Sequence, residues 1–213
     1  MRAEWDPVSL ETLSRVKDWV EEQVRCHDGP FILGVGGPGG SGKSRVAEWL
    51  RVHVADLVVL GLDDFRLPRK NRPKHAPFGS HPDAIDWDRL EDVLRDVKAG
   101  GPVRQPVFDR LTGSATKENL LPGGDVILLD GEITSHERMF PYLDKRIVVR
   151  AHLWTQLRTR LNRDRRERWT SLKKTLRIFY RSNLCDYPRF ASKSAPDVSL
   201  YRKSNHQLYI EES

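Results

Sequence analysis

The sequence has little cysteine and no long apolar run. Its two cysteines, Cys26 and Cys185, show no metal-site spacing and are too few for a disulfide framework. No segment approaches the roughly 20 consecutive apolar residues that cross a bilayer. The first residues, MRAEWD, also lack the apolar stretch of a secretion signal. We therefore expect a cytoplasmic protein with no membrane partner.

Internal repeats and low-complexity tracts are absent from the 213 residues as well. A chain of this length is most simply one main domain. We expect that domain over residues 31–213, after a helical extension over 1–30 that serves packing or a homo-oligomer. The net charge of +6 suits anionic ligands such as nucleotides, and it does not by itself indicate nucleic acid.

A phosphate-binding loop is the strongest feature of the sequence. The apolar run 31–35 leads into G-x-x-x-x-G-K-S, and a helix-forming segment follows, which is the strand-then-helix context of this motif. Its glycines allow successive N–H groups to turn toward an anion, at the positive end of a helix. The expected nucleotide-binding residues are Gly37, Pro38, Gly39, Gly40, Ser41, Gly42, Lys43, Ser44 and Arg45.

Two residues of this loop have predicted roles of their own. Lys43 would contact the β- and γ-phosphates of ATP, and the Ser44 hydroxyl would be a Mg²⁺ ligand. The alternative is an ordinary glycine-rich turn, which the flanking strand and helix disfavour.

Apolar strand patterns alternate with helical ones along the chain, which predicts an α/β fold with a mostly parallel sheet covered on both faces. The expected strands are 31–35, 56–62, 103–108, 125–130, 146–150, 197–201 and 206–210. The expected helices are 7–25, with Asp6 as its N-cap, one after the phosphate loop, 86–98, 153–169 and 172–184. We expect a substrate-side loop at 66–82 and a polar loop at 109–119.

Carboxylates end two of the expected parallel strands, at the sheet edge where the phosphate loop lies. Asp63 is the candidate general base for a substrate hydroxyl, and it could also lie near the metal. Adjacent Asp64 could exchange roles with it, and either could instead be a cap or a surface charge. Asp130 is the candidate Mg²⁺ ligand, with Glu132 as a rival two residues later.

An arginine-rich stretch within 153–187 is the second basic feature. A solvated basic helix is one interpretation, but so dense a run repels itself unless an anion approaches. A lid that closes over the triphosphate would use these arginines. Helical spacing places Arg160, Arg163 and Arg168 on one face.

With these pieces assembled, residues 31–201 resemble the uridine kinase family, whose relatives include nicotinamide riboside kinase, pantothenate kinase and phosphoribulokinase. The resemblance rests on motifs in matching order and spacing: GPGGSGKS (37–44), LDDF (62–65), HPDAIDWD (81–88), QPVFD (105–109), LLDG (128–131) and RLNRD (160–164). It implies a P-loop NTPase-type α/β/α domain with an arginine-rich lid. The implied activity is ATP- and Mg²⁺-dependent transfer of the γ-phosphate to a hydroxyl of a small metabolite.

The resemblance also implies roles for individual residues. It favours Asp63 over Asp64 as the catalytic base, gives Asp130 to Mg²⁺, and assigns Arg160 and Arg163 to the lid.

The acceptor pocket departs from the uridine kinase pattern. Ser80 stands where an Asp is typical, and Phe108 to Arg110 and Gly113 replace a Tyr-Asp-Phe and a His. These changes predict poor uridine binding. Arg110 hints at an anionic acceptor, unless it pairs with Asp109. The expected acceptor-side residues are Asp64, Ser80, Asp88, Phe108 and Arg110.

Two other functions remain open at this point. The basic lid and loop could serve phosphorylation of a modified nucleoside or nucleic acid, although nucleic acid is the less favoured partner. Alternatively, the chain could be a nucleotide-dependent binding module without transfer activity. The adenine contacts are expected near residues 201–205.

Overall fold

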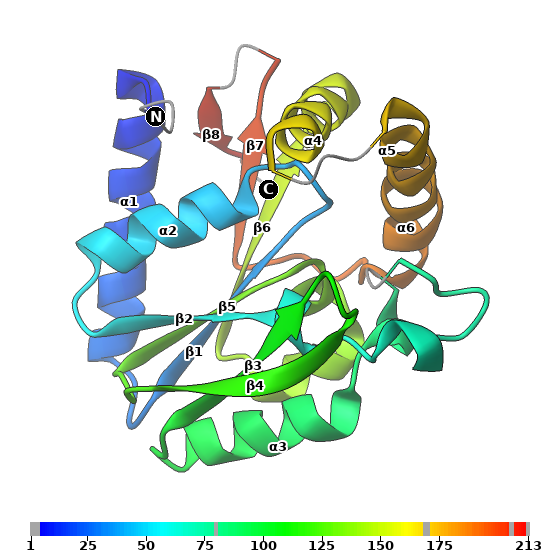
Figure 1. Ribbon diagram of the computed structural model, residues 1–213. Coiled ribbons are helices and arrows are strands. Elements are labelled where there is room, and N and C mark those ends of the chain that lie inside the picture. Colours follow the sequence, from blue (N-terminus) through cyan, green and yellow to red (C-terminus); the bar gives the residue numbers. More distant parts are fainter. Residues whose placement is uncertain (1–4, 79–80, 168–170, 205–206, 212–213) are drawn as a thin grey trace.

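The computed structural model describes residues 5–78, 81–167, 171–204 and 207–211 (Figure 1). Its centre is a six-stranded sheet in the order β2-β5-β1-β6-β7-β8. Neighbouring strands run parallel, except that β8 is antiparallel to β7. The strands are β1 (Phe31–Gly36), β2 (Leu57–Gly61), β5 (Val126–Asp130), β6 (Lys145–Ala151), β7 (Val198–Arg202) and β8 (Leu208–Ile210). This confirms the predicted α/β class with a mostly parallel sheet.

Helices cover both faces of this sheet. Alternate residues of β1 enter different cores: Phe31, Leu33 and Val35 face one, and Ile32 faces the other. On the first face lie α1 (Pro7–Arg25) and α2 (Lys43–His53), and on the second lies α3 (Trp87–Lys98). The result is three layers, with the phosphate loop between β1 and α2.

The first helix, predicted over 7–25, is confirmed. The Asp6 carboxylate accepts from the Ser9 amide at 3.1 Å, and Pro7 stands in the first turn. The apolar face of α1 is buried in the protein's own core, and Thr12 Oγ1 donates to the Leu208 carbonyl of β8 at 2.9 Å. A homo-oligomer stays a prediction, and it would have to use another face of α1.

The C-terminal helices follow β6. They are α4 (Leu153–Glu167), α5 (Leu172–Phe179), a π-helical segment η6 (Tyr180–Asp186) and α6 (Tyr187–Phe190). Figure 1 shows α5 and α6 standing beside the loop that follows β2. Short 3₁₀ segments fill the connections: η1 (Leu62–Phe65), η2 (Arg69–Asn71), η3 (Pro82–Ala84), η4 (Glu132–Ser135) and η5 (Glu137–Tyr142). No helix in the described ranges is long and apolar enough to span a membrane.

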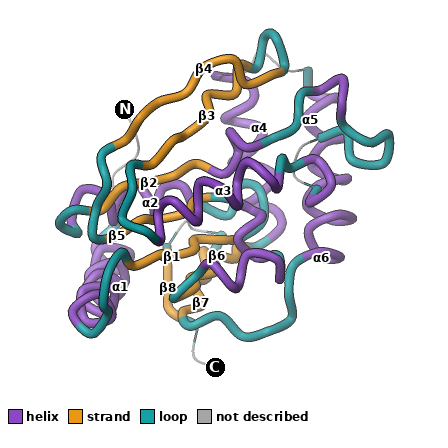
Figure 2. Tube along the Cα trace, turned by 90° about the horizontal axis from the view of Figure 1, so that it is seen from below, coloured by secondary structure: helices purple, strands orange, loops and turns teal. Residues whose placement is uncertain are grey.

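One sequence prediction was wrong. Residues 109–119 are not a polar loop, because β4 (Ser114–Leu121) pairs antiparallel with β3 (Val103–Asp109). Every residue of β4 is at least partly exposed, so the strand carries no apolar alternation by which to recognise it. Figure 2 shows this hairpin lying beside the main sheet and not within it.

Candidate active site

The backbone of the phosphate loop adopts a conformation that residues other than glycine rarely adopt. Gly37, Gly40 and Gly42 have φ angles of 136°, 85° and 111°, and Gly42 is the N-cap of α2. A Cβ atom at Gly37 would lie 2.1 Å from the Val149 carbonyl oxygen, and one at Gly40 would lie 2.4 Å from that of Gln156. The loop is therefore pressed against β6 and α4, and the N-terminus of α2 follows it directly.

Asp130, at the end of β5, lies against this loop. Burial raises the pKa of its carboxyl group, whereas the Lys43 charge and a hydrogen bond with the Ser44 side chain oppose the rise, and the Asp63 charge adds to it. Its Oδ1 atom is buried without a hydrogen-bond partner among the described residues. A carboxylate oxygen and a hydroxyl in this arrangement fit Mg²⁺, which prefers oxygen ligands.

Glu132, the rival metal ligand, is also close to the loop. A Cβ atom at Gly39 would lie 2.9 Å from its Oε1. Its Oε2 is a further buried oxygen without a hydrogen-bond partner in the described part of the chain. Glu132 also lies within electrostatic range of Arg160. Both carboxylates therefore stay candidates, and of the two only Asp130 has a described hydrogen bond with the Ser44 side chain.

Asp63 and Asp64 have different surroundings in η1. The Asp64 carboxylate accepts from Gln105 Nε2 at 2.8 Å and from the Phe108 amide at 3.2 Å, so it holds the β3–β4 hairpin. The Asp63 side chain is 56% exposed and pairs with Arg66 at 2.5 Å. Both oxygens of Asp64 therefore have partners in the hairpin, and Asp63 stays the candidate base.

The lid arginines follow a different pattern from a solvated helix. Arg160 is buried, and its Nη1 donates to Ser182 Oγ at 2.8 Å and to Asn183 Oδ1 at 2.6 Å. Asn183 Nδ2 in turn donates to the Gly39 carbonyl at 2.7 Å. Burial lowers the pKa of Arg160, and nearby Glu132 opposes that shift. Arg160 and Asn183 thus join α4 and η6 to the tip of the phosphate loop.

The other two predicted lid arginines are less constrained. Arg163 Nε lies 3.5 Å from Asp164 Oδ1, and the Asp164 carboxylate also accepts from Thr175 Oγ1 at 3.1 Å. Arg163 lies within electrostatic range of Arg160. Arg168 lies outside the described residues.

Arginines gather in the loop after η1, on the side where the sequence predicts the acceptor. Burial lowers the pKa of Arg72 to about 10, and the charges of Arg66 and Arg69 lower it further, whereas Asp63 opposes the shift. Arg72 Nε donates to the Leu67 carbonyl at 2.9 Å, and its guanidinium lies 5.2 Å from the centroid of the Phe108 ring. Its Nη2 is buried without a hydrogen-bond partner among the described residues.

The remaining acceptor-side candidates lie farther out. Arg110 is exposed at the hairpin turn, and its carbonyl accepts from Arg69 Nη2 at 2.5 Å. The Asp109 carboxylate accepts from the backbone amides of Leu111 and Thr112, at 2.7 and 3.4 Å, which stabilises that turn. Asp88 is exposed in the first turn of α3. Ser80 lies outside the described residues.

Two residues near the nucleotide end complete the site. The Arg45 guanidinium lies 3.8 Å from the centroid of a Trp5 ring, on the α1 side of α2. Arg202 of β7 approaches the loop from the region expected to contact adenine, because a Cβ atom at Gly42 would lie 3.4 Å from its Cδ.

The sequence did not predict the contacts of Asn183 and Gln156 with the phosphate loop, or the burial of the Arg72 guanidinium. No motif marks the first two, which contact the phosphate loop only because α4 and η6 fold back over it. Arg72 was one of many basic residues in a loop without periodicity. Its buried, unpartnered nitrogen is visible only in three dimensions.

Comparison with known proteins identifies the family of the chain. The model of the phosphoribulokinase and uridine kinase family matches residues 32–198. The chain belongs to this family. Its relatives include uridine-cytidine kinases, and the chain is a P-loop kinase that transfers phosphate from ATP to a hydroxyl group.

Two relatives are similar over most of their length. Uridine-cytidine kinase B of Dictyostelium discoideum is 30% identical over 188 residues, covering 85% of this chain and 74% of that protein. Uridine-cytidine kinase 2-B of Danio rerio is 32% identical over 199 residues, covering 85% and 76%. Several other relatives are longer, and the chain spans only 29% to 42% of four of them.

A solved structure supports the fold. The putative fructose transport system kinase from Silicibacter superposes with a TM-score of 0.72 at 17% sequence identity, covering 88% of this chain and 98% of that one. At this identity the likeness concerns the fold alone.

Proposed function

We propose that this kinase uses ATP and Mg²⁺ to phosphorylate an alcohol group on a small anionic metabolite, and that it does not favour pyrimidine nucleosides. The observation that carries this proposal is the group of arginines around Asp63, in which Nη2 of Arg72 is buried and unpartnered among the described residues. A buried guanidinium nitrogen of this kind favours a carboxylate or phosphate partner.

On the phosphate side, the loop amides from Gly37 to Gly42 and the Lys43 ammonium hold the triphosphate. Ser44 and Asp130, with Glu132 as the alternative carboxylate, would hold Mg²⁺, which offsets the charge of the phosphates when bound. Arg160 and Arg163 would lie at the transferring group. Arg160 already reaches the tip of the loop through Asn183.

On the acceptor side, Asp63 takes the proton of the attacking hydroxyl. Its Arg66 partner at 2.5 Å holds the carboxylate in position. Phe108 and Arg72 would contact the acceptor, and Arg110 lies near the outer end of the same hairpin. Asp64 acts by holding the hairpin in place.

The test is a matched acceptor screen. The purified protein is incubated with Mg²⁺ and ATP, and ADP release is measured with hydroxy acids, with the neutral polyols that correspond to them, and with uridine and cytidine. We expect kcat/KM to be higher for a hydroxy acid or sugar phosphate than for its neutral counterpart by about tenfold or more, the worth of one charge-assisted hydrogen bond. Preference for uridine over every anionic acceptor would overturn the proposal.

Nucleic acid as acceptor is a separate alternative. The arginines of the acceptor loop would then contact phosphodiesters, and binding to RNA or DNA should weaken steeply with salt. A binding assay at two salt concentrations distinguishes it from the small-molecule proposal. We also propose a cytoplasmic location, which the two free cysteines suit.

A further inference from the structure

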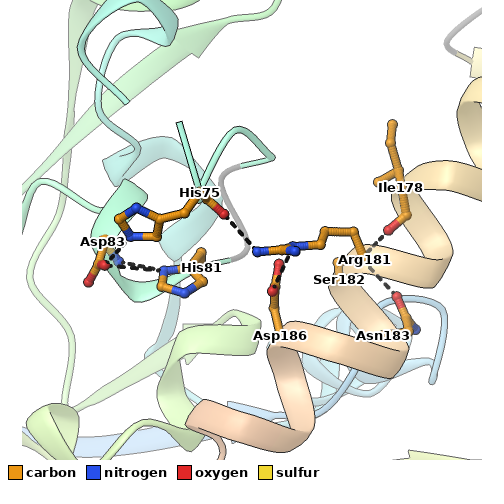
Figure 3. Close-up of polar contacts among 8 residues, drawn as sticks. All are labelled: His75, His81, Asp83, Ile178, Arg181, Ser182, Asn183 and Asp186. Carbon is orange, nitrogen blue, oxygen red and sulfur yellow. Dashed lines mark hydrogen bonds and ion pairs between the residues drawn. The ribbon is translucent and has the colours of Figure 1, made fainter. Parts of the chain in front are cut away.

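Three metal-ligating side chains face one another on the acceptor side, apart from the residues assigned to phosphate transfer. They are His75, in the loop after η2, and His81 and Asp83 at η3. Nε2 of His75 is 2.7 Å from Oδ2 of Asp83, and Nδ1 of His81 is 3.7 Å from the same oxygen. All three ligand atoms lie within 4.8 Å of one another, and Figure 3 shows them converging.

We propose that His75, His81 and Asp83 bind one Zn²⁺ ion. Two imidazole nitrogens and a carboxylate oxygen are a ligand set that zinc accepts, with a fourth position open to water. Mg²⁺ and Ca²⁺ prefer sites made wholly of oxygen, and this cluster offers one carboxylate. The site shares no residue with the proposed magnesium site, so it does not depend on the proposed function.

Small side-chain movements would complete the coordination. Zinc lies about 2.0–2.1 Å from histidine nitrogens and about 2.0–2.2 Å from carboxylate oxygens, so tetrahedral ligand atoms are about 3.3 Å apart. The contact between His75 and Asp83 must lengthen slightly, and that between His81 and Asp83 must shorten. His81 Nδ1 would also give up the hydrogen bond that it accepts from the Asp83 amide at 3.2 Å. That amide is exposed, so water can replace the lost acceptor.

The backbone around the cluster is held in place. His81 is the N-cap of η3, and Trp87 Nε1 donates to the Pro82 carbonyl at 3.0 Å. The Leu67 amide donates to the Ala84 carbonyl at 2.8 Å, which ties η3 to the segment after Asp63. Two of the three ligands therefore stand on a fixed turn, and His75 approaches from the loop.

The charged groups near the cluster do not oppose the binding of a cation. The Arg181 guanidinium, which donates to the His75 carbonyl at 3.0 Å, also pairs with buried Asp186 at 3.0 Å. His136 lies within electrostatic range of Asp83 and His81, and burial lowers its pKa, which favours its neutral form.

A bound ion would restrain the acceptor loop between two contacts with the rest of the protein. One is the hydrogen bond from Arg181 of η6 to His75, and the other is the link between Leu67 and Ala84. The loop contains Arg69, Lys70 and Lys74, which are trypsin cleavage sites because none of them precedes a proline. Zinc should therefore slow tryptic cleavage of this loop.

The experiment measures Zn²⁺ binding to the full chain after treatment with a chelator, in excess Mg²⁺, by competition with a chromophoric zinc chelator. We expect one equivalent to bind, and we expect His75→Asn, His81→Asn and Asp83→Asn each to lower the affinity by at least about a hundredfold. The matched control is His53→Asn, which removes an exposed histidine of α2 that stacks on Trp49. Asp130→Asn separates this site from the magnesium site and should keep the zinc affinity.

A second measurement does not depend on zinc affinity alone. Co²⁺ in place of Zn²⁺ should give the visible absorption of a site with nitrogen ligands, and that absorption should be lost in the three site variants. The rate of tryptic cleavage in the loop should fall on adding Zn²⁺ to the wild type and stay unchanged in His75→Asn. Binding that is equal in the wild type and the three variants, or no binding at all, would overturn the proposal.

Discussion

At the phosphate end of the site the backbone is surrounded by fixed neighbours: Val149 of β6, Gln156 of α4 and Asn183 of η6 all meet the loop. At the acceptor end, Asp63 and Arg72 rely on an irregular loop and on a hairpin that lies outside the main sheet. The phosphate end therefore depends on the conformation of its backbone, and few substitutions in the loop would preserve that conformation. The acceptor end depends on side chains that can change without disturbing the core.

This contrast explains how one fold can keep a reaction and change its substrate. In the proposed function the triphosphate is bound mostly by backbone amides, which the glycines and the helix N-terminus provide. In the proposed function the acceptor contacts the side chains of Arg72, Phe108 and Asp63, and each of these can be replaced without changing the backbone that binds the triphosphate. We expect substitutions at the two ends to separate into effects on catalysis and nucleotide binding, and effects on acceptor selectivity.

The largest expected effect is at Asp63. Asp63→Asn removes the proposed proton acceptor, so kcat should fall by about 10³-fold while the affinity for ATP stays near the wild-type value. The adjacent Asp64→Asn keeps that base and weakens the attachment of the hairpin, so its main effect should be on KM of the acceptor. Steady-state kinetics and ATP titration of both variants test the distinction. Equal losses of kcat in the two would remove the assigned difference.

A smaller effect is expected at the phosphate loop. Gly40→Ala places a Cβ atom 2.4 Å from the Gln156 carbonyl oxygen at a φ of 85°, which should lower ATP affinity by roughly a hundredfold, or about 2–3 kcal/mol. Gly29→Ala is the matched control, because Gly29 has a φ of 86° and no atom within 4 Å of the added Cβ. It should cost only about 1 kcal/mol of stability. Nucleotide titration and thermal unfolding of the two variants separate the effect of the Cβ contact at position 40 from the effect of the positive φ, which both positions share.

Arg72 tests the acceptor end directly. Arg72→Met keeps much of the apolar contact with Phe108 and removes the guanidinium, so KM for an anionic acceptor should rise by about 10- to 100-fold with kcat little changed. Lys70→Met, at an exposed position of the same loop, removes an equal charge and should have a much smaller effect. Similar rises in both variants would mean that overall charge, and not Arg72, attracts the acceptor.

The same two ends differ in what the sequence could predict. The phosphate loop, Asp130 and the helix over 7–25 follow local rules, because glycine conformation, strand ends and capping are each encoded within a few residues. The β3–β4 hairpin was missed at its second strand, since β4 has no buried face and therefore no apolar alternation. Asn183 and Arg72 depend on which distant segments meet, and no local pattern records that.

The choice between Asp63 and Asp64 shows the limit clearly. Neighbouring carboxylates on the same strand end are equivalent in the sequence, and family resemblance alone favoured the first. The contacts from Gln105 and Phe108 separate them, and both belong to a hairpin that the sequence had only half predicted.

The smallest expected effect concerns Asp130, where function and stability should oppose each other. Burial raises the pKa of this carboxyl above its ordinary value, so the fold disfavours the ionised form. Below the raised pKa the proton stabilises the folded state, and as the pH rises through that pKa this stabilisation is lost and ionisation costs folding free energy. At neutral pH, Asp130→Asn should therefore raise the unfolding free energy by about 1 kcal/mol in the absence of ligands.

The same variant should lose the additional thermal stabilisation that Mg²⁺ gives in the presence of ATP, because the carboxylate oxygen beside Ser44 is gone. Asp125→Asn is the control, since Asp125 is exposed just before the other end of the same strand and should change neither quantity. Thermal unfolding with ATP, with and without Mg²⁺, measures both effects. If Asp130→Asn destabilised the ligand-free protein, the hydrogen bond with Ser44 and the Lys43 charge would outweigh the burial of the carboxylate, and the phosphate end would be stabilised by its charges as well as by its backbone.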